Sequence, residues 1–179
     1  MKPFIGIKQL WYGNVLASDL SGPTAVATLV ASMTEIKNVH QGTWGYSQDD
    51  PTVTEYVNEL TGQPYYRDKE TLGARTITFS LGVYDFETKA ALQGGSVVTE
   101  GEGQSAKIVG WKSSGALENV NKCIVAKTKT GNWIVFSNAA IVAKGDQQEK
   151  NITLGITAVC MESETNGVEA EYMFEAASA

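Results

Sequence analysis

The chain has 179 residues, near the usual size of one domain, so we expect a single domain spanning residues 1–179. Its 42% hydrophobic and 19% charged residues are ordinary for a globular protein and argue against disorder and against a membrane protein. The net charge of −6, without any run of Lys or Arg, argues against attraction to a nucleic-acid backbone.

The first twenty residues mix short apolar and polar stretches and indicate a short strand or an extended arm. The apolar run before Lys8 is too short for a signal peptide. No stretch approaches the roughly 20 apolar residues of a membrane span. We therefore expect the protein to be made and kept in a cytoplasm-like compartment, or to be released by lysis.

The clearest helix is predicted over residues 23–34. Pro23 suits the first helical position. The apolar residues that follow recur at i, i+3, i+4 and i+7, which places them on one helical face: Val26, Leu29, Val30 and Met33. The pattern is typical of a helix that packs on the core.

The next segment is harder to assign. Strand structure with a bulge is expected over 36–47, followed by a turn over 47–51. Residues 52–60 fit a helix, because Asp50 can cap it and apolar residues form a stripe. The same residues are β-branched and aromatic, which favours a strand.

The strongest strand is predicted over 75–84, where four large apolar residues alternate with polar ones: Ile77, Phe79, Leu81 and Val83. A one-residue slip would expose all four, at roughly 1.5 to 3 kcal/mol each, so the register is firmly fixed. A short helix over 85–92 follows, capped by Asp85. The acidic segment 99–104 is expected to be a mobile loop.

The last third is typical of a β meander. Strands are expected over 122–128, 133–136, 140–143 and 152–160, with polar turns over 129–132 and 145–150. From residue 162 onward we expect an acidic tail with a frayed end. The 18 scattered glycines mark many turns, so the chain is expected to be β-rich.

No catalytic or metal-binding constellation is visible. The single histidine, His40, has no metal ligand near it in the sequence. Cys123 and Cys160 are expected to be small core residues, with a disulfide between adjacent strands as the alternative. Carboxylate pairs such as Asp49 with Asp50, and Glu100 with Glu102, are interpreted as solvated turn residues.

Aromatic residues are concentrated between residues 44 and 66, the one segment whose composition favours a surface role. We take six residues as candidates for contacts between subunits: Trp44, Tyr46, Tyr56, Tyr65, Tyr66 and Arg67. Ordinary core and half-buried sheet positions are the alternative interpretation.

The order of these features resembles the tail tube proteins of long-tailed phages and their relatives in contractile injection systems. The resemblance covers roughly residues 36–161 and rests on a loose pattern of strands and turns. Its first part runs through Trp44-Gly45-Tyr46, Asp49-Asp50-Pro51, Thr54-Glu55-Tyr56, Gly62, Tyr66-Arg67, Gly73, the strand over 76–81 and Gly94-Gly95. Its closing part runs from Lys129 through Trp133-Ile134-Val135-Phe136 to the segment 145–152.

The resemblance implies a small β-barrel or sandwich flanked by a helix, which assembles into hexameric rings that stack into a hollow tube. It implies no catalysis and no cofactor. It makes residues 44–69 a long hairpin for subunit or ring contacts, which favours a strand over 52–60. The partners would be the chain itself and other tail proteins, with no specific nucleic-acid binding and no membrane.

The same resemblance places the protein in the virion tail, or in the host cytoplasm before assembly. An acidic lumen would repel DNA and let it slide. The segment 99–104 and the N-terminal arm would order only on stacking. A β-sandwich binding module for carbohydrate or a cell-surface partner is the second hypothesis, and an enzyme is the third.

Overall fold

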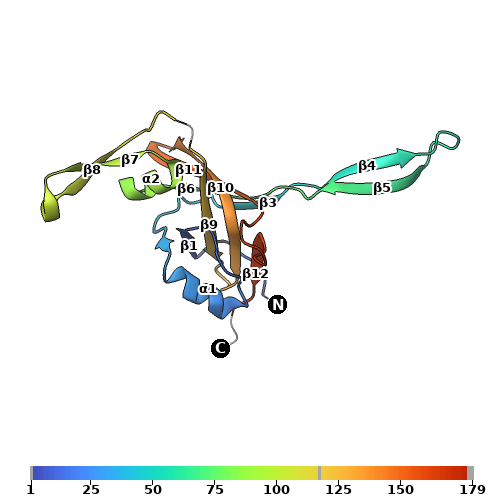
Figure 1. Ribbon diagram of the computed structural model, residues 1–179, viewed down its shortest axis with the longest axis horizontal. Coiled ribbons are helices and arrows are strands. Elements are labelled where there is room, and N and C mark those ends of the chain that lie inside the picture. The colour runs from blue at the N-terminus through green and yellow to red at the C-terminus, as the bar shows by residue number, and fades with distance from the viewer. Residues whose placement is uncertain (1, 117, 177–179) are drawn as a thin grey trace.

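Twelve strands and two α-helices make up residues 2–116 and 118–176, the part of the chain that the computed structural model describes (Figure 1). The strands are β1 (Gln9–Gly13), β2 (Thr34–Glu35), β3 (Gly45–Gln48), β4 (Thr52–Val57), β5 (Pro64–Thr71), β6 (Arg75–Leu81), β7 (Ser96–Glu100), β8 (Lys107–Lys112), β9 (Val120–Lys127), β10 (Trp133–Gln148), β11 (Asn151–Cys160) and β12 (Glu171–Phe174). The helices are α1 (Pro23–Val30), α2 (Phe86–Gln93) and the short 3₁₀ helix η1 (Gly103–Ser105).

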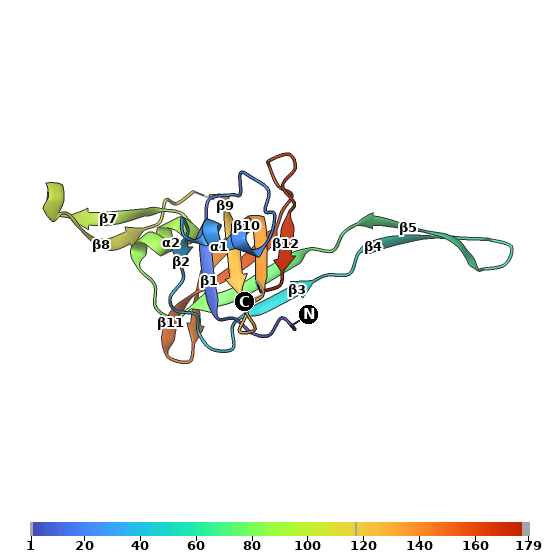
Figure 2. The same ribbon diagram turned by 90° about the horizontal axis from the view of Figure 1, so that it is seen from below.

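Eight strands form one antiparallel sheet, in the order β2-β1-β9-β10-β11-β6-β3, with β12 added beside β10. Its edge strands β2 and β3 do not pair with each other in the described part of the chain, so the sheet is not a closed barrel. It curls instead, so that β6 and β11 pack against β1 and β9 in a sandwich-like arrangement (Figure 2). The mainly β, antiparallel fold expected from the sequence is confirmed.

Two apolar cores lie on opposite faces of β9 and β10, because successive side chains of a strand point to opposite faces. The first core lies inside the curl and contains Leu10, Ile77, Phe79, Ile124, Phe136, Leu154 and Ile156. The second core lies between the sheet and α1 and contains Trp11, Leu16, Leu20, Val26, Val125, Trp133 and Val135. A strand buried on both faces needs near-continuous apolar residues, which β9 and β10 supply.

Strand β10 is 16 residues long and passes through a bulge at Ser137 and Asn138. Both side chains are buried, and Ser137 Oγ and Asn138 Nδ2 donate to carbonyls of neighbouring loops, whereas Asn138 Oδ1 has no partner among the described residues. The Ser137 backbone N–H donates to the Ala170 carbonyl over 3.0 Å, and Asn138 Nδ2 donates to the Glu162 carbonyl over 2.9 Å. The bulge therefore attaches the segment that follows β11 to the centre of the sheet.

Both predicted helices are present, with different ends. α1 ends at Val30, earlier than expected, because the chain tightens into i→i+3 bonds at Ala31, Ser32 and Met33. Met33 still packs on the second core, so the predicted apolar face is correct. α2 starts at Phe86, and Asp85 caps it by accepting a 2.6 Å hydrogen bond from the Thr88 N–H. Each α-helix has eight residues, and neither is long and apolar enough to cross a membrane.

Several sequence-based boundaries are wrong. Of the predicted strand 36–47, only residues 45–47 are in a strand, as part of β3, although Ile36, Val39 and Trp44 do pack on the first core. The turn expected over 47–51 contains the end of β3. The polar turn expected over 145–150 belongs largely to β10, whose polar residues continue to pair with β11 beyond the core.

Three further differences concern solvent exposure and missed strands. Val83 lies beyond the end of β6 and is 73% exposed, so it does not share the buried face of that strand. Ile152 is equally exposed, because it lies at the outer end of β11. The expected acidic tail contains β12, which pairs with β10 and brings Tyr172 and Phe174 to the second core. The frayed end expected for the tail includes 177–179, which lie outside the described residues.

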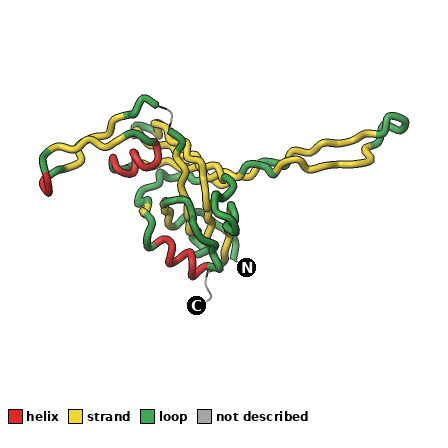
Figure 3. The backbone as a smooth tube through the Cα atoms, viewed as in Figure 1, coloured by secondary structure: helices red, strands yellow, loops and turns green. Residues whose placement is uncertain are grey.

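Two hairpins project from the body in opposite directions (Figures 1 and 3). We name β4 and β5 with their connecting turn the long arm, and β7, η1 and β8 the short arm. The segment 52–60, which local patterns left open, is strand through Val57 and then turns. The long arm is almost wholly exposed, since every residue of β5 and all but one of β4 lie in solvent.

The long arm joins the body through a narrow neck. The Asp49 N–H donates to the Ala74 carbonyl over 2.9 Å, and the next residue outward on the returning leg is Gly73. A Cβ at position 73 would overlap the Asp49 carbonyl oxygen. Only a glycine lets the two legs of the hairpin approach this closely.

The substitution Gly73→Ala is therefore expected to force the legs of the neck apart, at about 1 to 3 kcal/mol of unfolding free energy. Gly145→Ala is the matched control, because a Cβ at position 145 of β10 meets open space. Thermal unfolding and hydrogen exchange of residues 52–71 would measure both variants. Equal stability and equal exchange in the two variants would show that the neck does not depend on Gly73.

Candidate interaction surface

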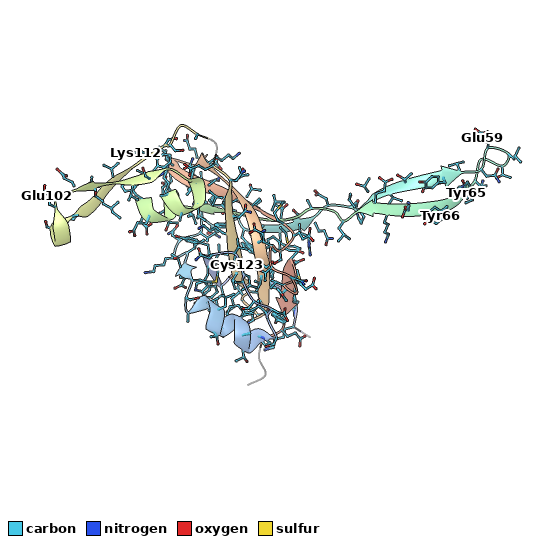
Figure 4. All side chains as sticks on the ribbon, in the orientation of Figure 1. Glu59, Tyr65, Tyr66, Glu102, Lys112 and Cys123 are labelled. Carbon is cyan, nitrogen blue, oxygen red and sulfur yellow. The ribbon has the colours of Figure 1, made fainter. Side chains whose placement is uncertain are left out.

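Within residues 2–116 and 118–176, no three His, Cys, Asp or Glu side chains lie together as ligands for a metal ion. His40 is half-buried in a loop, where its backbone N–H donates to the Ser80 carbonyl over 2.7 Å. Asp49 and Asp50 lie at the neck, and Glu102 lies far from them on the short arm (Figure 4).

The two cysteines are free thiols on opposite faces of the sheet. Cys123 of β9 is fully buried in the second core, and Cys160 of β11 packs against the first. Burial raises the pKa of Cys123 to about 12, so this thiol is unreactive in the folded protein. Strand β10 separates the two strands, so the alternative of a disulfide across adjacent strands is wrong.

The six predicted contact residues divide into two groups. Four belong to the long arm: Tyr56, Tyr65, Tyr66 and Arg67. Trp44 and Tyr46 lie at its base instead, where the chain leaves the body. Trp44 packs against the first core, so its main role is structural.

The four arm residues are exposed on a two-stranded ribbon. Tyr56 and Tyr66 are cross-strand partners with ring centroids 5.8 Å apart, and Tyr65 is 71% exposed (Figure 4). Arg67 Nε lies 2.8 Å from a carboxylate oxygen of Glu55, its partner on β4. This ion pair is exposed and contributes at most about 1 kcal/mol. The tyrosines therefore lie on the outer half of the arm, and most of its charges lie nearer the body, except for Glu59 at the apex.

The apex of the long arm was not predicted from the sequence. Leu60 stands in the connecting turn and is 94% exposed. The turn around it is well ordered by hydrogen bonds: Gly62 N–H donates to the Asn58 carbonyl (2.7 Å), and Leu60 N–H donates to Asn58 Oδ1 (2.8 Å). A single leucine in a turn has no periodic pattern, so only its size among turn residues could have indicated it.

At the base of the long arm, Tyr46 belongs to a polar network that ties β3 and β6 to β12. The Tyr46 hydroxyl donates to Glu171 Oε1, and Arg75 Nη1 donates to Glu171 Oε2, each over 2.8 Å. Burial and the hydrogen bond to Glu171 raise the pKa of Tyr46 to about 12. The network fixes the strands from which the long arm starts.

The short arm was also missed, because its acidic, glycine-rich turn was interpreted as a mobile loop. The β-branched runs on either side, at 96–99 and 107–109, are the signal that could have identified a hairpin. Trp111 anchors its base: the indole N–H donates to the Gly94 carbonyl over 2.8 Å, and Lys89 Nζ lies 4.4 Å from the ring centroid. Farther out, Val98, Ile108 and Val109 are 38–49% exposed.

The N-terminal segment lies along the β9–β10 turn. The Lys129 N–H donates to the Ile5 carbonyl (3.0 Å), and Asn132 Nδ2 donates to the Lys2 carbonyl (2.7 Å). The segment is thus paired within the single chain, contrary to the expectation that it orders only on stacking. With Trp44 and Tyr46, this segment lines a cavity of about 350 Å³.

Comparison of the sequence with models of protein families and with curated proteins found no match. A functional proposal therefore depends on the surfaces described above and on the pattern of the sequence itself.

The raised pKa of Tyr46 predicts a loss of stability at alkaline pH. A tyrosine holds its proton more tightly in the folded state when its folded pKa is about 12 instead of the ordinary value of about 10. Its contribution is present below pH 10 and is lost as the pH rises from about 10 to about 12. The stability advantage of the wild type over Tyr46→Phe should shrink across this range.

The difference in tyrosinate absorbance between the wild type and Tyr46→Phe would give the midpoint of the Tyr46 titration. Glu171→Gln removes the charge and is expected to bring that midpoint closer to its ordinary value. A constant stability difference from pH 9 to pH 12 would contradict the role assigned to the network.

Proposed function

We propose that this protein is a structural subunit of a phage or phage-derived tail tube, in which copies of the chain form hexameric rings that stack into a conduit for DNA. The observation that carries the proposal is the pair of projecting arms. Most of their side chains lie in solvent, although both arms carry exposed apolar and aromatic residues.

The backbone of the arms supports self-assembly. Each arm is a two-stranded sheet, and an isolated two-stranded hairpin is at best marginally stable in water. An exposed strand edge also offers unpaired N–H and C=O groups to another chain. Contact with neighbouring copies would bury the apolar residues of the arms and would also give hydrogen-bond partners to the N–H and C=O groups of these edges.

The geometry of the arms supports a ring or tube over a simple dimer. The arms leave the body on opposite sides (Figure 1). A contact between an arm of one copy and the body of the next is heterologous, and repetition of such contacts produces a ring or an open filament. The net charge of −6 would keep a central passage from holding DNA. Other tail proteins would be its further partners, and the virion tail its location.

A carbohydrate or cell-surface binding module is the second candidate, favoured by the exposed tyrosines of the long arm. Sugar-binding platforms use aromatic faces with neighbouring polar groups. Here the four tryptophans are buried or half-buried, and the exposed tyrosines lie on a narrow ribbon. This arrangement fits protein contacts better than a sugar-binding groove.

Self-assembly is the direct test. We expect purified protein to form rings or tubes that grow with concentration, measured by light scattering and by negative-stain electron microscopy of the same samples. A variant in which a short Gly-Ser turn replaces residues 52–71 should remain folded, because the long arm contributes no residue to either core. It should not form these assemblies.

A monomer of 19.2 kDa at every concentration, together with binding in a glycan panel, would favour the binding module. Assembly that persists without the long arm would assign the contacts to other surfaces.

A further inference from the structure

The apex of the long arm has the properties of a docking element. Leu60 is 94% exposed, and a leucine gains roughly 1.5 to 3 kcal/mol when it is buried. The hydrogen-bonded turn around Asn58 holds it in place, so little conformational entropy would be lost on binding. Glu59 beside it gives the apex a negative charge (Figure 4).

The cavity at the base of the arm has complementary properties. Phe4, Trp44, Tyr46, Ile134 and Met173 supply aromatic and aliphatic walls around about 350 Å³. A cavity of roughly 150 Å³ already accommodates benzene, so this space is large enough for a leucine side chain. The apolar walls of this cavity therefore match the apolar side chain of Leu60 at the apex.

Charges around the two sites are opposite. The chain beside the cavity carries Lys2, Lys8 and Lys129, whereas Lys127 lies over the ring of Trp133 in the second core, on the other face of the sheet. The carboxylate of Glu171 behind Tyr46 is paired with Arg75. The stem of Lys129 lies beside Gly6, in the cavity wall. Glu175 follows β12 at this end and already has an interaction of its own. The long arm, residues 52–71, has four carboxylates and two cations, which gives −4 + 2 = −2.

Two larger pockets compete with the cavity. One of about 390 Å³ at the neck is lined by Glu162 and Glu169 against Arg75, and the other, of about 780 Å³, lies beside α2. The lining of the groove beside α2 carries Glu35 and Asp85 against a single cation, Lys37. An acidic apex would be repelled there, so charge favours the cavity at the base of the arm.

We infer that Leu60 of one copy docks in the cavity formed by Phe4, Trp44 and Ile134 of a second copy, with Glu59 facing Lys129. The inference rests on the proposed function. The long arm leads away from the body (Figure 1), which holds the residues that line the cavity, so the apex reaches this site only on another molecule. Each copy then offers one apex and one cavity, and the contact repeats from copy to copy.

Charge reversal tests the contact in the full chain. Glu59→Lys and Lys129→Glu are each expected to weaken self-association about fivefold, and the double variant should recover most of the wild-type affinity. Leu60→Ser is expected to weaken it about tenfold or more. Leu72→Ser is the matched control, since Leu72 is 80% exposed on the same hairpin but lies at the neck, and its effect should stay below twofold.

A photo-crosslinking amino acid at position 60 gives an independent result. Crosslinks to residues 2–8 or 128–134 of a second copy, mapped by mass spectrometry, would support the contact. Assembly with crosslinks elsewhere, or without recovery in the double variant, overturns this contact while the tube proposal stands. A monomer that forms no intermolecular crosslink at high concentration counts against both.

Discussion

Strand β10 is the element on which the rest of this structure depends, because it pairs with three other strands and contributes side chains to both cores. Its first residues pair with β9 and β12, and its later residues pair with β11. Alternate side chains enter the two cores, so Phe136 and Val135, adjacent in sequence, are buried on opposite faces. The register of β10 with β9 shifts at the bulge formed by Ser137 and Asn138. Hydrogen bonds from these two residues hold the loop that leads to β12.

The burial of each element determines whether it could be predicted from the sequence. Strands β6 and β11 were recognisable because one face of each lies in the first core, which imposes alternation. The arms lack such a pattern, since neither is packed on the body along its length. The aromatic content of residues 44–66 indicated a surface there, but Leu60 gave no periodic signal. The end of β10 was missed because its polar residues, such as Lys144 and Asp146, lie beyond the core.

Stability and interaction are separated in this chain. The two cores, the bulge and the network around Glu171 hold the body together without help from either arm. The arms contain exposed tyrosines and β-branched residues that contribute little to folding of the monomer. If the arms are the interaction surfaces, as proposed, their residues can change without disturbing the cores of the body.

The narrow neck at Asp49 and Gly73 also has a mechanical consequence. The eight residues of β5 span about 27 Å at roughly 3.4 Å per residue, so a 10° rotation at the neck displaces the apex by about 5 Å. In the proposed tube, the bodies of neighbouring copies could then shift by several ångströms while the contact at the apex is kept. Rotation at the necks would let such a tube bend without opening its wall.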